Sequence, residues 1–74
     1  MTLKEFYRFV DVNHYNNQSR WRVGQTLFNL LSDVRPEIAE KLRRTENDPF
    51  YTDSEDDPRY KGAIEVIEEE WNKL

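Results

Sequence analysis

Hydrophobic residues along this chain recur at intervals of three and four, which is the period of one face of an α-helix. Thr2 and Glu5 have the spacing of a capping box, in which each side chain bonds a free backbone N–H at a helix start. We therefore predict a helix over about Thr2–Asn13. Its apolar stripe is Leu3, Phe6, Tyr7, Val10 and, just beyond it, His14. Residues 13–19 are rich in short polar side chains, which compete with the helical backbone and predict a loop.

The most apolar run follows this polar segment and predicts a helix from about Ser19 to Ser32. Its stripe is Val23, Leu27, Leu30, Leu31 and Val34, widened by Trp21 and Phe28. A face this broad is typical of a central helix. Gly24 lies within it, where glycine costs about 1 kcal/mol relative to alanine. We expect close packing against a neighbouring helix there, with a backbone surface open to a ligand as the alternative.

Two prolines mark two further helix starts, because proline suits the first helical position. Pro36, followed by the acidic Glu37, predicts a helix over about Pro36–Arg43. This helix buries Ile38, Ala39 and Leu42. Asp57 caps and Pro58 opens the last predicted helix. Its stripe is Tyr60, Ile64, Ile67, Trp71 and Leu74.

Residues 45–57, between the last two predicted helices, form the one long irregular stretch. Asn47-Asp48-Pro49 is a turn signal, and Phe50 and Tyr51 are adjacent apolar groups, at least one of which should enter the core. We therefore expect an all-α fold with a single domain over residues 1–74. It is a compact bundle of three to four short helices with one long ordered loop, at about 45–57.

The composition argues against a catalytic or metal-binding site. There is no cysteine and only one histidine, so a zinc site would need His14 with carboxylates alone. His14 has no nucleophilic partner, and the two glycines cannot build a phosphate-binding loop. A calcium loop starting at Asp53 fails because Pro58 and Ile64 stand where glycine and glutamate are required. We expect no catalytic residue, no cofactor and no metal, so that the protein is not an enzyme.

No stretch approaches 18 consecutive apolar residues, and the N-terminus lacks the pattern of a signal peptide. The absence of cysteine fits a reducing compartment. We expect a cytoplasmic protein that does not span a membrane.

The formal net charge of −4 is unevenly spread: the first 25 residues carry four basic and two acidic groups, whereas residues 51–74 carry three basic and eight acidic groups. A basic-aromatic patch could form from Arg20, Arg22, Arg43 and Arg44 beside Trp21. Glu37 and Glu40 would face the nucleic acid on such a surface, and the net charge opposes phosphate binding. Nucleic-acid binding is therefore an alternative and not the favoured function.

Three segments carry a resemblance to known proteins. They read RVGQTLFNLL over 22–31, RPEIAEKLR over 35–43, and TENDPFY over 45–51, followed by Asp53. The chain resembles, over about residues 20–53, a group of small, uncharacterised proteins of tailed phages and bacteria. Their pattern has an Arg-x-Gly-Gln helix with Phe-Asn, leading into a Thr-x-x-Asp-Pro-Phe-Tyr loop. Arg44 stands where that pattern has a glycine, which would serve as a left-handed helix cap.

The resemblance implies a phage or prophage setting, in the host cytoplasm, and brings no activity with it. Gln25 and Asn29 are one helical turn apart and share a face. We expect them to hydrogen-bond the backbone of residues 45–51, with Phe50 inserted beside Gly24. The residues expected to anchor the loop are Gly24, Gln25, Asn29, Asp48 and Pro49. A binding role for these positions is the alternative.

We expect the protein to act by binding another protein, in a phage setting as an inhibitor or modulator of a host protein. Aromatic residues are enriched at binding hot spots. The expected contact residues are Trp21, Phe50, Tyr51, Asp53, Glu55 and Asp56. The acidic C-terminal third also allows an inhibitor that mimics nucleic acid. Besides nucleic-acid binding, the other alternative is a self-associating structural protein that forms a homodimer through Phe9 or Val66, which lie off their helix stripes.

Overall fold

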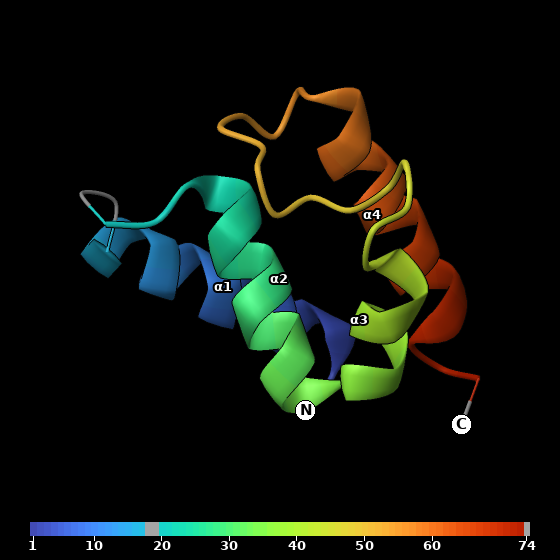
Figure 1. The fold of residues 1–74 in the computed structure, drawn as a ribbon. Coiled ribbons are helices and arrows are strands. Elements are labelled where there is room, and N and C mark those ends of the chain that lie inside the picture. The colour runs from blue at the N-terminus through green and yellow to red at the C-terminus, as the bar shows by residue number, and fades with distance from the viewer. Residues whose placement is uncertain (18–19, 74) are drawn as a thin grey trace.

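Four α-helices and no strand are present in the computed structural model, which describes residues 1–17 and 20–73. The helices are α1 (Leu3–Asn17), α2 (Val23–Val34), α3 (Pro36–Leu42) and α4 (Pro58–Glu70). Figure 1 shows α1 behind α2, with the irregular segment 43–57 crossing from α3 past α2 to the start of α4. The expected all-α bundle with one long loop is confirmed.

The first helix begins as its capping box predicts. The backbone N–H of Thr2 donates to Glu5 Oε1 at 2.7 Å, and that of Glu5 donates to Thr2 Oγ1 at 3.1 Å. The predicted end at Asn13 is wrong, because α1 continues to Asn17. The side-chain amides of Asn13 and Asn17 each donate to the carbonyl one turn earlier, at 2.8 and 2.9 Å. These side chains follow the helix instead of competing with its backbone.

The second helix begins at Val23, later than predicted, and ends at Val34. Ser19, the predicted start, lies outside the described residues. The backbone N–H groups of Arg20 and Trp21 both donate to the carbonyl of Asn17, so this stretch closes α1 and does not begin α2. Pro36 and Pro58 open α3 and α4 as predicted, and the Asp57 side chain accepts a hydrogen bond from the backbone N–H of Arg59.

The core surrounds α2, in agreement with its broad apolar face. Leu27 and Leu31 are fully buried, and α2 packs against both α1 and α3. The other helices contribute Phe6, Val10, Ile38, Ala39, Leu42, Tyr60, Ala63 and Ile67, followed by Trp71 just after α4. The ring centroids of Phe6 and Trp71 lie 5.1 Å apart, and the Arg35 guanidinium lies over the Trp71 indole, 4.5 Å from its centroid. Aromatic burial of this kind supplies much of the stability of a domain this small.

The loop is fixed to α2 at Gly24. The backbone N–H of Gly24 donates to the carbonyl oxygen of Thr52 at 3.1 Å, and a Cβ atom at Gly24 would collide with the Pro49 carbonyl and Thr52 Oγ1. Pro49 and Thr52 are buried. The close packing predicted at Gly24 is therefore present, but its partner is the loop and not a neighbouring helix.

The anchoring expected from Gln25 and Asn29 is wrong. Among the described residues, no hydrogen bond joins either side chain to the loop; Arg22 donates instead, from Nε to the Phe50 carbonyl at 3.3 Å. Phe50 does not occupy the place beside Gly24, which Pro49 and Thr52 fill. The residues that face the loop backbone are Arg22, just before α2, and Gly24, within it. The face predicted from Gln25 and Asn29 was therefore wrong by part of a helical turn.

Asp48 organises the loop from within. Its carboxylate accepts from the backbone N–H of Arg44 at 2.8 Å and from that of Phe50 at 3.0 Å. Arg44 itself has a φ of 61°, the left-handed conformation that a glycine cap would adopt. Arg44 therefore makes the left-handed turn for which a glycine would be the usual residue.

Candidate functional site

The most distinctive exposed feature is a cluster of rings and guanidinium groups from α2 and the loop. It consists of Arg22, Phe28, Arg43, Phe50 and Tyr51, and is called here the aromatic–arginine surface. The Phe50 ring packs edge-on against Phe28 at 6.0 Å and against Tyr51 at 5.0 Å between centroids. The Arg22 guanidinium lies 5.6 Å from the Phe50 centroid and 5.1 Å from that of Tyr51. These are distances at which cation–π attraction operates.

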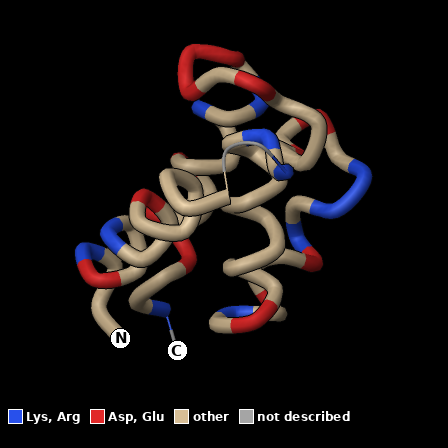
Figure 2. Tube along the Cα trace, turned by 90° about the vertical axis from the view of Figure 1, so that its left-hand side faces the viewer, with Lys and Arg blue, Asp and Glu red and all other residues tan. Residues whose placement is uncertain are grey.

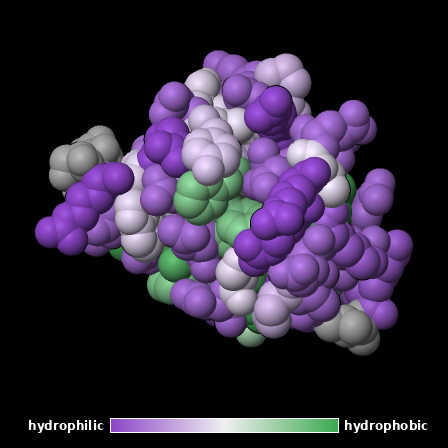
Figure 3. Space-filling model, in the orientation of Figure 1, coloured by the Kyte–Doolittle hydropathy of each residue, from purple (hydrophilic) through white to green (hydrophobic). Residues whose placement is uncertain are grey.

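A pocket of about 360 Å³ opens beside these rings. Its walls are Phe28, Asn29, Ser32, Arg43, Arg44, Asp48, Phe50 and Tyr51. Figure 3 shows hydrophobic atoms near the middle of this face, surrounded by hydrophilic ones. The Arg43 guanidinium lies 5.1 Å from the Phe28 centroid while its Nε donates to Glu40 at 2.9 Å, so this arginine is held in place from two sides. The pocket thus combines an apolar floor with hydrogen-bond donors at its rim.

Tyr51 is the exposed aromatic residue of the surface. The residue is 73 % accessible, although Phe50 and Arg22 contact its ring. The next residue, Thr52, is buried and bonded to α2 through the Gly24 N–H. An exposed aromatic ring is therefore presented on backbone that is already ordered.

The predicted contact residues divide into two groups. Phe50 and Tyr51 lie together in the aromatic–arginine surface, whereas Trp21 is half-buried and does not line its pocket. Asp53, Glu55 and Asp56 are exposed, and Glu55 lines a different pocket.

Of the four arginines considered for nucleic-acid binding, Arg22 lies over the Tyr51 ring, and Arg43 and Arg44 line the same pocket as Tyr51. Arg20 is exposed and does not line the pocket. No sequence signal indicated that Phe28 and Ser32 belong to this site. Their spacing of four residues places them on one side of α2, but only the path of the loop brings Tyr51 to that side.

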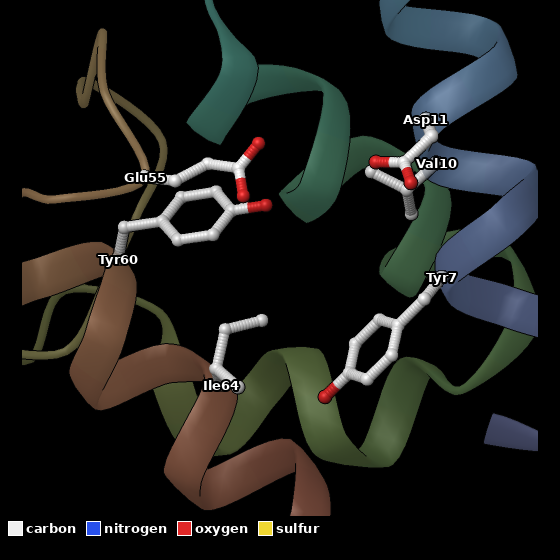
Figure 4. Close-up of a pocket in the computed structure, with 6 residues that line it drawn as sticks. All are labelled: Tyr7, Val10, Asp11, Glu55, Tyr60 and Ile64. Carbon is white, nitrogen blue, oxygen red and sulfur yellow. The ribbon is translucent and has the colours of Figure 1, made fainter. Parts of the chain in front are cut away.

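A second pocket, of about 250 Å³, lies between α1, α4 and the acidic end of the loop. It is lined by Tyr7, Val10, Asp11, Glu55, Tyr60 and Ile64 (Figure 4). Burial, and then the negative charges of Glu55 and Asp11, raise the pKa of Tyr60 well above its ordinary value. Burial, and then the charge of Glu68, raise the pKa of Tyr7 to about 12.

The residues suggested for self-association differ in exposure. Phe9 is 37 % accessible and lies on α1 near the exposed Val12 and Tyr15. Val66, in contrast, is partly buried against the core. Of the two positions, Phe9 therefore offers more apolar surface to a second copy.

Within residues 1–17 and 20–73, no group of three or more His, Asp or Glu side chains is placed to hold a metal ion. Nor does any helix in that part of the chain have the length and apolar character needed to cross a membrane. Comparison of the chain with protein-family models, with curated proteins and with solved structures gave no match.

Proposed function

We propose that this protein is a binding module that recognises another protein through the aromatic–arginine surface. One observation carries the proposal: the largely exposed Tyr51 ring is held by Phe50 and Arg22 beside a pocket. Tyrosine and arginine are enriched at the few interface residues that dominate binding energy. Because the Tyr51 ring is largely exposed, it would contribute little to the stability of the fold if no partner protein bound it.

The order already present in the loop favours binding. Immobilising a flexible loop on association costs free energy, which lowers affinity. Here Asp48 bonds two backbone N–H groups, and Gly24 bonds the Thr52 carbonyl, before any partner arrives. The pocket beside Tyr51 has the size for one or two partner side chains between its apolar floor and polar rim.

The resemblance of residues 20–53 to small phage and bacterial proteins supports a bacterial host protein as the partner. In that setting the protein would inhibit or redirect the host protein by occupying one of its surfaces. The aromatic–arginine surface lies almost wholly within the resembling segment.

The test is a quantitative pull-down from bacterial lysate with two matched variants. Tyr51→Ala and Tyr15→Ala each remove a tyrosine of nearly equal exposure, 73 % and 74 %. Wild type and Tyr15→Ala should recover the same stoichiometric partner, and Tyr51→Ala should bind it at least about tenfold more weakly. Equal recovery by both variants, or no stoichiometric partner with any of them, contradicts the proposal.

A second candidate function, binding of nucleic acid, rests on the gathering of Arg22, Arg43 and Arg44 around aromatic rings. Single strands are bound by such combinations of cations and stacking platforms. The neighbouring charges weaken this candidate, because Glu40 pairs with Arg43 and the acidic segment 53–57 continues the same loop. Figure 2 shows red acidic positions at the top of the fold, where the loop leads into α4.

A gel-shift titration decides between the two candidates. Electrostatic binding is strongest at low salt. A nucleic-acid binder should therefore shift the band of single-stranded DNA or RNA at about 50 mM salt, and this shift should disappear as the salt concentration rises. Arg44→Glu should then abolish the shift. The absence of any shift at about 50 mM salt excludes nucleic acid.

A further inference from the structure

The second pocket brings together charges and rings from three parts of the chain. Asp11 and Tyr7 come from α1, Tyr60 from α4, and Glu55 from the loop; these four residues define the acidic tyrosine pocket. Figure 4 shows the Glu55 and Tyr60 side chains on one side of the hollow, with Asp11 and Tyr7 on the other. Val10 and Ile64 complete the lining with apolar surface.

The two carboxylates lack a cationic partner. The ion pairs among residues 1–17 and 20–73 involve Glu37, Glu40 and Glu70, and none of them involves Asp11 or Glu55. The charges of Asp11 and Glu55 both affect the Tyr60 hydroxyl, because each raises its pKa. Among the described residues, two negative charges therefore line this pocket with no cation at ion-pair distance from either.

We propose that the acidic tyrosine pocket binds the cationic side chain of a lysine or arginine that a partner protein presents. A volume of about 250 Å³ lies below the range of pockets that enclose whole small-molecule ligands, and it suits a single long side chain. The aliphatic stem would lie along Val10, Ile64 and the tyrosine rings. The charged end would then reach the carboxylates of Asp11 and Glu55.

The lining selects an organic cation over a metal ion. It offers two carboxylates and no histidine, and the apolar walls give nothing to the hydration shell of a metal. Tyrosine rings attract ammonium and guanidinium groups through their π faces. The pocket shares no lining residue with the pocket beside Tyr51, so the inference holds whether or not the proposed function is right.

The experiment is an NMR titration of the ¹⁵N-labelled full chain with model side chains. The probes are the acetyl-methylamides of lysine and of norleucine, its uncharged analogue, together with free spermidine. At low salt the lysine probe should shift the amide signals of Asp11 and Glu55 and the ring signals of Tyr60 in a saturable way. The norleucine probe should shift them far less.

Two variants make the result specific. Glu55→Gln should lower the affinity for the lysine probe by about threefold or more, as expected for loss of one partly exposed charge pair. Glu65→Gln, which removes an exposed carboxylate of α4 outside the pocket, should leave the affinity unchanged. Since Glu55 is exposed, neither change should alter the thermal unfolding temperature.

Each remaining outcome overturns the inference. A norleucine response equal to that of lysine would show an apolar site, and equal weakening by both variants would show nonspecific charge attraction. No saturable response to lysine would show that the pocket takes no side-chain cation. Spermidine binding that exceeds lysine binding by more than the excess expected from its extra charges, about tenfold, would assign the pocket to free polyamines.

Discussion

Gly24 and Gly62 both lie within helices, but they have different surroundings in the structure. Gly24 faces the backbone carbonyl of Pro49 and the bonded hydroxyl of Thr52, whereas Gly62 faces only the tip of the Asn47 side chain. A side-chain tip can rotate away, but a loop backbone held at several points cannot move without breaking contacts.

Gly24→Ala should therefore destabilise the fold by about 1–3 kcal/mol, the usual effect of forcing extra volume into a packed site. Gly62→Ala should be neutral, or stabilising by up to about 1 kcal/mol, because alanine is the better helix former. Urea unfolding of both variants measures the difference. Similar effects for the two would mean that the loop does not pack on Gly24.

Arg44 carries backbone strain that a glycine would not. Its φ of 61° costs a residue with a Cβ atom about 1–2 kcal/mol. Arg44→Gly should therefore be more stable than Arg44→Ala by about 1 kcal/mol. At Arg43, whose φ is −56°, the same pair of substitutions should give the opposite order. Denaturant unfolding of the four variants tests this, and the same order at both positions would count against a strained turn.

At the scale of elements, the loop is held by its own carboxylate and by α2. Asp48 accepts two backbone hydrogen bonds, whereas Asn29 makes none with the loop among the described residues and lines the pocket instead. The two residues were expected to share one structural role, and the structure separates them.

Asp48→Ala should lower the free energy of unfolding by about 1–3 kcal/mol, since two N–H groups lose an ionised acceptor. Asn29→Ala should change it by less than about 0.5 kcal/mol. Thermal and urea unfolding provide the measurement. An Asn29 effect as large as that of Asp48 would restore Asn29 as an anchor of the loop.

At the scale of the whole molecule, the tyrosines between α1 and α4 make the fold sensitive to alkali. Tyr7 and Tyr60 have folded-state pKa values above the ordinary value of 10.0. The folded state therefore retains these protons more strongly than the unfolded chain does. Their stabilising contribution is complete below about pH 10 and is lost as the pH rises toward the folded-state pKa.

Tyr7→Phe tests this contribution. Among the described residues no hydrogen bond of normal geometry reaches the buried Tyr7 hydroxyl, although the Glu68 carboxylate lies near enough to raise its pKa. Removal of this hydroxyl at pH 7 should therefore leave the stability unchanged or raise it by about 1 kcal/mol. Between pH 10 and 12 the variant should lose less stability than wild type. Tyr15→Phe, at an exposed position, is the control. A loss of more than about 1 kcal/mol at pH 7 would show that the hydroxyl is bonded.

The sequence by itself determined that the chain forms four helices and where α1, α3 and α4 begin. The Thr2–Glu5 box, Pro36 and the Asp57–Pro58 pair act on backbone groups within three residues, so their effect can be deduced without the rest of the fold. The broad stripe of α2 likewise indicated its central place. The end of α1 was misjudged because asparagine side chains can bond either within a helix or in a turn, and local sequence does not choose between them.

Only the tertiary structure decided where the loop lies. Its docking on Gly24 brings Tyr51 to Arg22 and to the Phe28 side of α2, and it places Glu55 opposite Asp11. These pairs are far apart in sequence and share no periodic signal. Their meeting depends on the whole path of an irregular segment, because local bonds of Asp48 and Thr52 shape the turn but only the long-range bond from the Gly24 N–H to the Thr52 carbonyl places it on α2. Both candidate binding sites follow from that path.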